Sequence, residues 1–596
     1  MVDPNRMCSF DMPLTVAAVS GTETPVVYLN GEVETAGDGS SASSPVKTLA
    51  AAYAVLNGGD GTIVLCGNIS VSANKTDATA NSAFSATTGN ILYTGKDPVS
   101  GTEYNPVITI TGTNNDLTIV EFLTTTEFSY VTFNATTNKT PYLVSGPSLT
   151  IGEGVVFKYK GNLLTSTTTD TFGIRVGSYV SKINGKYTQK SGTIGSVYGG
   201  GIKETGTSEI NITGTAKVLV RLEAGGRQAK VDTSTINISG QAEVNTLLFG
   251  GYKSSVGSVT ANISGGKVNS VVTSRETTAS ATVDIATLTI SDSAKVGSIT
   301  LDSRNANGNN TLTISNNQTL TENFGAYWDT INIGSYADVE LNGTYDGTGT
   351  LKVDGRLTLN ANMNEQTVVD ALADANTGSG RIVSSGAVGA PVTVYLDGAD
   401  GSDTNGGTGT GDAVKTLARA YELMDGNSGT IVICGDLEIA SSDLNNTSAF
   451  SVKFGNVVYT GKDPVTAEIY PVKITVVDGT DTDLVQIFTP TVFEYLTFDA
   501  CTNRSTMFVT GKSLTFGEGM TFLRDGKLIT NTTSDEIVVR LGSKTEKIAP
   551  TFIMKSGVIS SVYGGNQFKD SGKTTIKISG DSQILVRLEC GANGRD

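Results

Sequence analysis

A short strand pattern returns at a nearly constant spacing in the first half of the chain, and this repeat constrains the fold more than any other feature. Within each copy of the pattern, apolar and polar residues alternate, as in a β-strand with one buried face. The gaps between successive copies are 26, 25, 27 and 24 residues. The copies read INITG, INISG, ANISG, LTISD and LTISN, with the equivalent residues Ile212, Ile238, Ile263, Ile290 and Ile314.

One unit of this repeat is too small to fold alone. It holds two or three short strands and their turns without room for a helix, so it cannot bury its own apolar face. Stacked units bury that face against each other and pair their backbones as parallel ladders. A coil of about 25 residues fits a three-faced parallel β-helix better than a β-propeller, whose blades need about 40–45 residues. The sequence therefore predicts an all-β solenoid.

A second, longer repeat indicates that the chain contains two copies of one design. The segment YTGKDPV begins at Tyr93 and again at Tyr459, 366 residues later. The pairs GTIVLCG and GTIVICG, SVYGG and SVYGG, and LVRLE and LVRLE keep the same order at nearly the same offset. Such agreement indicates a tandem duplication. Copy one continues well beyond its LVRLE, whereas copy two stops soon after, so we expect the second domain to be truncated and the native protein to be longer.

These patterns divide the chain into four parts. Residues 1–23 form a leader or tag-like segment that lacks the apolar core of a signal peptide. Residues 24–376 form the first β-helix domain, and residues 377–390, rich in small residues, form a linker. Residues 391–596 form the second β-helix domain, a duplicate of residues 24–225.

Each copy opens with a strand, a helix and a second apolar strand, and Thr48 and Thr416 are placed as N-caps of the two helices. A further short helix is predicted at 365–375, with Val368 and Leu372 on its apolar face. The strand–helix–strand opening resembles that of pectate-lyase-like right-handed parallel β-helix proteins, especially bacterial cell-surface proteins. The resemblance implies two tandem right-handed parallel β-helices, each with a short N-terminal capping helix over the open end of the coil.

The composition excludes several functions. The chain has no histidine, which excludes histidine general bases, Ser-His-Asp triads and histidine-ligated zinc. The net charge is −16 and the 42 basic residues form no stripe, so we expect no nucleic-acid partner. No run of 18 apolar residues is present, so we expect no membrane span in this chain. The five cysteines form no CxxC motif and indicate no disulfide framework.

One set of charged and aromatic residues is retained in both copies and is the strongest candidate for a binding site. The two arginines of each copy are 46 or 47 residues apart, about two coils, so they would form a stripe able to grip an acidic glycan. The tyrosines precede Gly-Gly and would offer sugar-stacking platforms, with Phe249 placed alike. The alternative is a ladder of surface ion pairs with little effect on stability. The candidates are Arg175, Tyr198, Lys203 and Arg221 in copy one and Arg540, Tyr563, Lys569 and Arg587 in copy two, beside Glu204, Glu223, Asp570 and Glu589.

An oxygen-rich loop follows the first strand of copy two. The segment LDGADGSDTNGG supplies Asp397, Asp400 and Asp403, hard oxygen ligands of the kind that calcium prefers. The loop lacks the spacing and the closing Glu of an EF-hand, and the alternative interpretation is a polar turn. Calcium is therefore the one candidate cofactor, and no catalytic residue is assigned.

These patterns favour a non-enzymatic module of a large extracellular or cell-surface protein: an adhesin, a glycan-binding surface or a structural stalk. Its partner would be a polysaccharide or a host surface glycan. The resemblance also leaves open a polysaccharide lyase or glycoside hydrolase acting on acidic glycans, although the missing histidine breaks the Gly-His-Gly pattern of the family's hydrolases. A lyase needs clustered carboxylates and a Lys or Arg base. A phage tailspike, which would be a trimer, is the third alternative.

Overall fold

The computed structural model describes residues 24–591 with internal gaps, and its contacts divide the chain into two compact units. One unit comprises Val16–Val353 and Leu357–Ile382, and Val383–Asp596 belongs to the other. The residues between 24 and 591 that the structure does not describe are 73–83, 85, 113–117, 138–139, 228, 275–280, 306–308, 336, 361–362, 364–365, 385–391, 425–427, 441–449, 451–455, 478–482, 501–505, 544–547 and 566–572.

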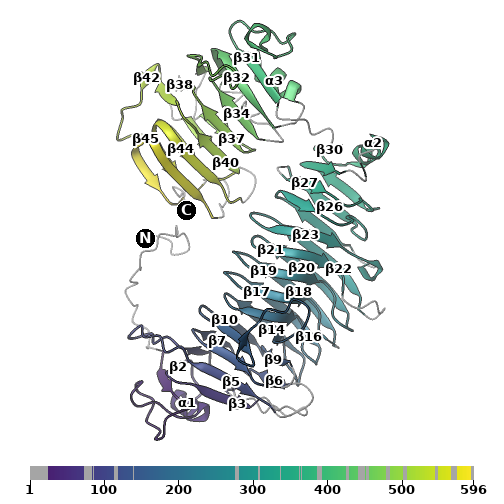
Figure 1. Cartoon of the computed structure of the whole chain (residues 1–596), viewed down its shortest axis with the longest axis vertical. Helices are drawn as coiled ribbons and strands as arrows, with labels where there is room; N and C mark the ends of the chain where they lie inside the picture. The colour runs from purple at the N-terminus through teal and green to yellow at the C-terminus, as the bar shows by residue number, and fades with distance from the viewer. Residues whose placement is uncertain are drawn as a thin grey trace. The chain divides into compact units, whose positions relative to one another are not determined.

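The first unit is built from parallel strands that stack coil upon coil, the arrangement of a β-solenoid (Figure 1). Its 13-stranded sheet runs in the order β1 (Val26–Leu29), β2 (Gly61–Leu65), β4 (Ile91–Thr94), β7 (Thr126–Ser129), β10 (Ser148–Ile151), β14 (Ile183–Gln189), β16 (Thr205–Ile212), β18 (Val231–Ile238), β20 (Val256–Ile263), β22 (Val283–Ile290), β24 (Thr311–Ile314), β26 (Thr330–Ile333) and β28 (Thr350–Val353). An eight-stranded sheet contains β6 (Thr118–Glu121), β9 (Pro141–Val144), β13 (Gly173–Arg175), β15 (Thr193–Tyr198), β17 (Lys217–Glu223), β19 (Glu243–Leu248), β21 (Lys267–Val272) and β23 (Lys295–Thr300).

Two smaller sheets complete the first unit. One contains β3 (Ile69–Ser72), β5 (Val107–Thr111), β8 (Thr132–Ala135), β11 (Val156–Tyr159) and β12 (Asn162–Leu163). The other contains β25 (Gln318–Leu320), β27 (Asp338–Leu341), β29 (Arg356–Leu359) and β30 (Arg381–Ser384).

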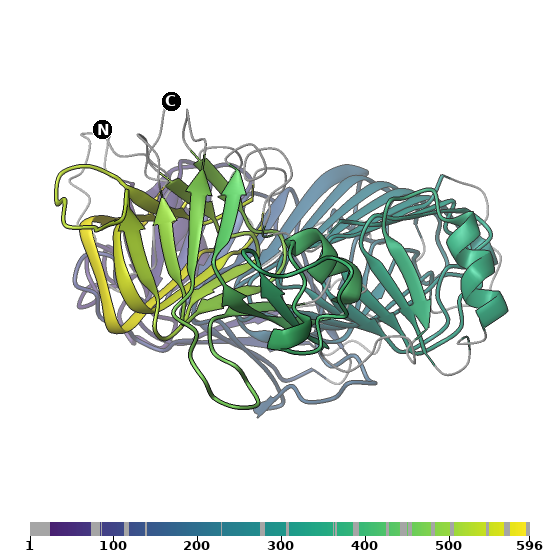
Figure 2. The same cartoon turned by 90° about the horizontal axis from the view of Figure 1, so that it is seen from above.

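The second unit repeats this plan with fewer coils (Figure 2). Its ten-stranded sheet contains β31 (Val392–Asp397), β32 (Gly429–Gly435), β34 (Val457–Thr460), β37 (Thr491–Glu494), β40 (Ser513–Phe516), β44 (Thr551–Tyr563), β43 (Ile537–Arg540), β39 (Thr506–Val509) and β36 (Asp483–Gln486), with β45 (Thr575–Glu589) paired to β44. Its five-stranded sheet contains β33 (Leu437–Ala440), β35 (Lys473–Val477), β38 (Thr497–Ala500), β41 (Thr521–Arg524) and β42 (Lys527–Leu528).

The repeated isoleucines form one column of the core, as the repeat predicts. Register pairs join Ile212 to Ile238, and onward through Ile263 and Ile290 to Ile314. All five side chains are buried inside the first unit. A parallel ladder thus buries each coil's apolar face against the coils on either side, which one coil cannot do alone.

The outward face of the same strands carries stacked polar side chains. Asn237 Nδ2 donates a hydrogen bond to Asn211 Oδ1 over 2.8 Å, and Asn262 Nδ2 donates to Asn237 Oδ1 over 2.9 Å. Thr235 and Thr260 are register partners on this face. The amide groups therefore satisfy one another from coil to coil and help to hold the register.

Within the part of the chain that the structure describes, three α-helices interrupt the strands: α1 (Leu49–Leu56), α2 (Gln366–Ala375) and α3 (Leu417–Met424). The predicted N-caps are confirmed, because Thr48 Oγ1 accepts a hydrogen bond from Ala51 N and Thr416 Oγ1 accepts one from Arg419 N, each over 3.2 Å. Among the described residues, no helix has the length and apolar character needed to cross a membrane.

The predicted third helix is confirmed as α2, but its buried face differs by one position. Val369 is buried in the core and Leu372 packs against it, whereas Val368 is only half-buried. The 3.6-residue period allows either valine on the apolar side of so short a helix, and contact with the coils selects Val369.

The assignment of inward and outward faces to these strands can be tested with two matched substitutions in the first unit. Ile236→Ala removes a fully buried side chain and should lower the free energy of unfolding by about 3 kcal/mol. Ile285→Ala, on the outward face where the side chain is 43% exposed, should change it by less than about 0.5 kcal/mol. Urea unfolding followed by the fluorescence of the single tryptophan, Trp328, reports this unit; equal costs would contradict the assigned register.

Candidate functional site

The register brings several of the predicted site residues together on the outward face of the eight-stranded sheet. Ser196 is the partner of Arg221, and Tyr198 is the partner of both Arg175 and Glu223. The residues between them on each strand point into the core, so these five side chains share the opposite face. Arg175 and Arg221 lie on β13 and β17 with β15 between them, two coils apart as their spacing predicts.

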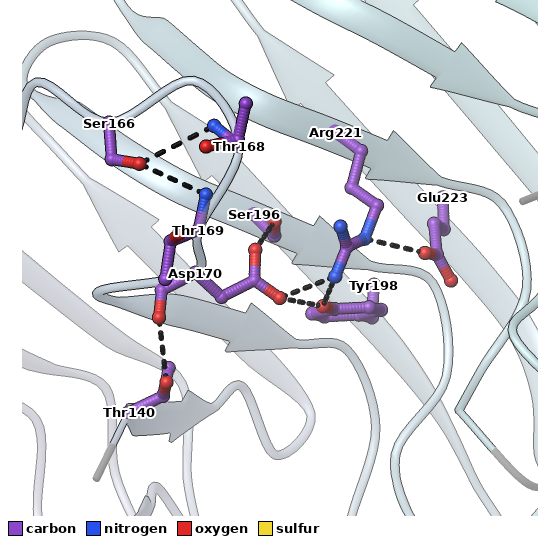
Figure 3. A network of polar contacts seen from close by, with 9 residues as sticks. All are labelled: Thr140, Ser166, Thr168, Thr169, Asp170, Ser196, Tyr198, Arg221 and Glu223. Carbon is purple, nitrogen blue, oxygen red and sulfur yellow. Dashed lines mark hydrogen bonds and ion pairs between the residues drawn. The ribbon is translucent and has the colours of Figure 1, made fainter.

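The centre of this cluster is Asp170, a residue that sequence reasoning missed (Figure 3). Its carboxylate accepts hydrogen bonds from Ser196 Oγ, from Tyr198 OH over 2.6 Å and from Arg221 Nη2. Its backbone carbonyl accepts a hydrogen bond from Thr140 Oγ1 over 2.7 Å. Asp170 precedes β13, so these contacts fasten the loop before that strand to the outward side of β15 and β17.

A second set of contacts compensates the positive charge of Arg221. Its Nε lies 2.9 Å from Glu223 Oε1, and its Nη2 donates a hydrogen bond to Tyr198 OH over 2.9 Å. Only 12% of the Arg221 side chain and 14% of the Asp170 side chain are exposed. One guanidinium is therefore shared between two carboxylates at a site that is largely removed from solvent.

The electrostatics of the cluster keep Arg221 and Tyr198 in their ordinary charge states. Burial alone lowers the pKa of Arg221, but Tyr198, Asp170 and Glu223 outweigh it and raise the pKa overall. Burial raises the pKa of Tyr198 far above its ordinary value, and the charge of Asp170 adds to the effect. At neutral pH the arginine stays protonated and the tyrosine stays neutral, which does not suit either group to act as a general base.

Arg175 occupies a different environment from Arg221. Its guanidinium lies 4.2 Å from the ring centroid of Tyr142 and 5.9 Å from that of Tyr198. Its side chain is 1% exposed, and the described residues provide it with no ion pair. Burial lowers its pKa. Contact with aromatic rings thus stabilises this cation in place of a carboxylate, and the rings cover the guanidinium from solvent.

The remaining candidate of copy one lies apart from the cluster. Lys203 is exposed in the loop between β15 and β16, and no described residue joins it to Asp170 or Arg221. Its neighbour Glu204 lies 3.5 Å from Lys182, a pair at the exposed surface. The structure therefore does not place Lys203 in one stripe with the arginines.

Copy two repeats the cluster around Asp535. Tyr563 OH donates a hydrogen bond to Asp535 over 2.7 Å, and Ser561 Oγ donates to the same carboxylate. Arg587 lies 3.9 Å from Asp535 and 3.7 Å from Glu589. The Arg540 guanidinium lies 4.4 Å from the Tyr563 ring centroid, and Lys569 and Asp570 fall outside the described residues.

The second cluster is looser because β45 is bounded by β44 alone. The Arg587 side chain is 38% exposed, whereas that of Arg221 is 12% exposed. In copy one, β19 lies against the far side of β17, but β45 has no such neighbour among the described strands. The same sequence therefore builds a buried ion pair in one unit and a half-exposed pair in the other.

The aromatic rings that were expected as sugar platforms are buried. Tyr198 and Tyr563 lie in the interior of their clusters, and Phe249 is in the core with its ring perpendicular to that of Trp328. Phe249 is not equivalent to Tyr198, because the register partner of Tyr198 is Glu223 and that of Glu223 is Leu248. The later coils have one more residue before Gly-Gly, which turns the phenylalanine inward.

The aspartates of the oxygen-rich loop make separate local contacts. Asp397 Oδ1 accepts hydrogen bonds from the backbone N–H groups of Ala399 and Asp400. Asp403 accepts hydrogen bonds from Lys415 N and Thr416 N, at the start of α3. Asp397, Asp400 and Asp403 are not gathered into one group, and no cluster of three or more Cys, Asp or Glu placed to hold a metal ion occurs among the described residues.

A signal for the missed aspartates is present in the sequence. Asp170 and Asp535 each stand five residues before the first arginine of their copy, Arg175 or Arg540, in loops rich in Thr and Ser. Both are retained, but the segments around them differ more than the strands do, and a strand-by-strand comparison does not select them. Taken together, each cluster can hold a loop against a sheet, because the carboxylate of its aspartate accepts hydrogen bonds from a serine and a tyrosine of the sheet.

No family model, curated protein or solved structure matches this chain. The assignment of a function therefore depends on the chain's own residues and geometry.

The cluster should contribute unequally to the stability of the two units. Asp170→Ala leaves the largely buried Arg221 with one carboxylate fewer and should lower the free energy of unfolding of the first unit by about 3 kcal/mol. Asp535→Ala frees an arginine that is already half-exposed but also removes the acceptor of the buried Tyr563 hydroxyl, and it should cost the second unit less, about 1.5 kcal/mol.

Tryptophan fluorescence separates the two effects, because Trp328 lies in the first unit. Asp535→Ala should leave the transition seen by fluorescence unchanged and shift the remaining transition seen by circular dichroism. An Asp170→Ala variant as stable as the parent chain would show that the contact does not fasten the loop.

Proposed function

We propose that this chain is a non-enzymatic structural module of a large extracellular or cell-surface protein. Its two units are, in this proposal, right-handed parallel β-helices of the pectate-lyase-like kind, each opened by a capping helix. The capping role is supported by Leu56 of α1 and Met424 of α3, which are buried in the cores of the first and the second unit. The bacterial surface origin rests on the resemblance of the opening segments.

The observation that carries the proposal is the internal pairing of the retained charged residues. Arg221 is paired with Asp170 and Glu223, and only 12% of its side chain is exposed, so little of its guanidinium is accessible to a glycan. Arg175 is covered by aromatic rings. A catalytic role lacks support as well, since the chain has no histidine and Arg221, whose pKa is raised, stays protonated at neutral pH.

A glycan-binding adhesin remains the second candidate, favoured by one observation in copy two. Arg587 and Glu589 are both more than a third exposed in the described structure, so this cluster still has donors and acceptors that face solvent. An acidic glycan would pair with Arg587 by charge-assisted hydrogen bonds. Under this candidate, the second unit binds the glycan and the first unit serves as a spacer.

A glycan array with and without calcium, followed by product analysis on every hit, distinguishes the candidates. A structural module should give no selective binding and no product. Selective binding that is lost in Arg587→Ala but kept in Arg419→Ala, an arginine of α3 that is partly exposed and lies outside the cluster, would establish the adhesin. Turnover of any glycan would overturn the proposal and make the chain an enzyme.

A further inference from the structure

A small apolar cluster lies on the outward face of the eight-stranded sheet, separate from the core inside the coils. Arg175 is the register partner of Val144 and of Tyr198, and its guanidinium faces the rings of Tyr142 and Tyr198. The side chain of Arg175 is 1% exposed. A cation is therefore enclosed among apolar side chains on the outside of the coil, where the buried members are Ile119, Tyr142, Val144 and Tyr198, with Tyr179 and Ile202 packed against them.

The guanidinium of Arg175 has no acceptor for its hydrogen-bond donors. Among the described residues, none accepts a hydrogen bond from its Nε, Nη1 or Nη2, and all three atoms are shielded from solvent. The faces of the two tyrosine rings attract the positive charge but do not satisfy the N–H groups. Arginine does not escape this cost by losing its proton, so a buried charge without hydrogen-bond partners requires an explanation.

The carboxylates near this cluster are engaged by other groups. Asp170 and Glu223 both pair with Arg221. Glu121 accepts hydrogen bonds from the segment that follows β13. In copy two the position of Glu121 is occupied by Gln486, whereas the buried arginine is retained. The chain therefore keeps the buried cation without keeping this carboxylate beside it.

Copy two repeats the arrangement at Arg540. Its register partners are Val509 and Tyr563, which occupy the positions of Val144 and Tyr198. Arg540 is 8% exposed, and no residue in the described part of the chain accepts a hydrogen bond from its Nε or Nη1. Its guanidinium also lies against the ring of Tyr563. The same missing acceptor thus occurs in both units.

We infer that Arg175 and Arg540 each bind one small monovalent inorganic anion, of which chloride is the simplest, as a structural ligand of their unit. The anion accepts the hydrogen bonds that the described residues do not accept, and its charge balances that of the guanidinium. Its size follows from the cover over Arg175, which excludes a sugar or an organic phosphate. A buried water molecule would provide an acceptor but no charge.

The dependence of stability on chloride tests these sites in the full chain. Chloride is exchanged for gluconate at constant ionic strength, so that general screening stays the same while the replacing anion is too large for the site. A ligand that binds the folded state alone stabilises it in proportion to the logarithm of its concentration, once that exceeds the dissociation constant. The urea midpoint of the first unit, followed by Trp328 fluorescence, should therefore rise steadily with chloride.

Two methionine substitutions serve as controls for each other. Methionine keeps much of the length of the arginine side chain and removes its charge and its donors. Arg175→Met should abolish the chloride dependence of the fluorescence transition and leave that of the remaining circular-dichroism transition. Arg540→Met should do the reverse.

A crystal of the parent chain grown in bromide tests the same sites without a substitution. Bromide replaces chloride and scatters X-rays anomalously, so a peak should lie at hydrogen-bond distance from the guanidinium of Arg175 and from that of Arg540. Peaks at the protein surface alone would show adventitious ions only and would contradict the inference.

Three further results would overturn the inference. The first is a urea midpoint of the parent chain that does not change with chloride. The second is a chloride dependence that persists in both methionine variants, because the anion would then bind elsewhere. The third is an Arg175→Met variant that is more stable than the parent chain at every chloride concentration, since an apolar side chain improves on a buried charge only where that charge is unbalanced.

Discussion

Parallel pairing between successive coils is the interaction on which the rest of this structure depends. A coil of about 25 residues has an apolar side that it cannot cover alone, and only a neighbouring coil in register covers it. The column of isoleucines from Ile212 to Ile314 shows this dependence, because each member is buried by the members before and after it. The charged clusters of the two units are built on the outward side of these ladders.

The charged clusters follow from the same geometry. A solenoid sheet has an outward face as well as an inward one, and in the first unit a loop covers part of that outward face. Asp170 supplies the loop's charge, and Arg221 and Tyr198 supply the partners from two adjacent coils. At an open surface such an ion pair would contribute little to stability. Here the loop excludes water, and removing one partner would leave a buried charge unpaired, so the pair holds the loop in place. Its weaker copy at Asp535 and Arg587 lies on β44 and β45, and among the described strands β45 pairs with β44 alone.

The repeated strands of this fold can be predicted from the sequence. The contacts of loops that pack on the outward face of a sheet cannot. Alternation and spacing predict the buried column, and Thr48 and Thr416 are recognised as N-caps because capping is a local event. Asp170 is missed because its partners are 26 to 51 residues away and its loop has no pattern of its own. Phe249 is misplaced because one added residue before Gly-Gly turns it inward, a shift that a motif comparison does not reveal.

A double-mutant cycle between Asp170 and Arg221 tests the central claim, that the retained charged residues are structural, most directly. Asp170→Ala, Arg221→Ala and the double variant are compared in urea unfolding of the first unit. The account predicts a coupling energy of at least about 1.5 kcal/mol, as contacting residues in one network give. A coupling below about 0.5 kcal/mol, the range of independent sites, would contradict it and leave Arg221 free for a ligand.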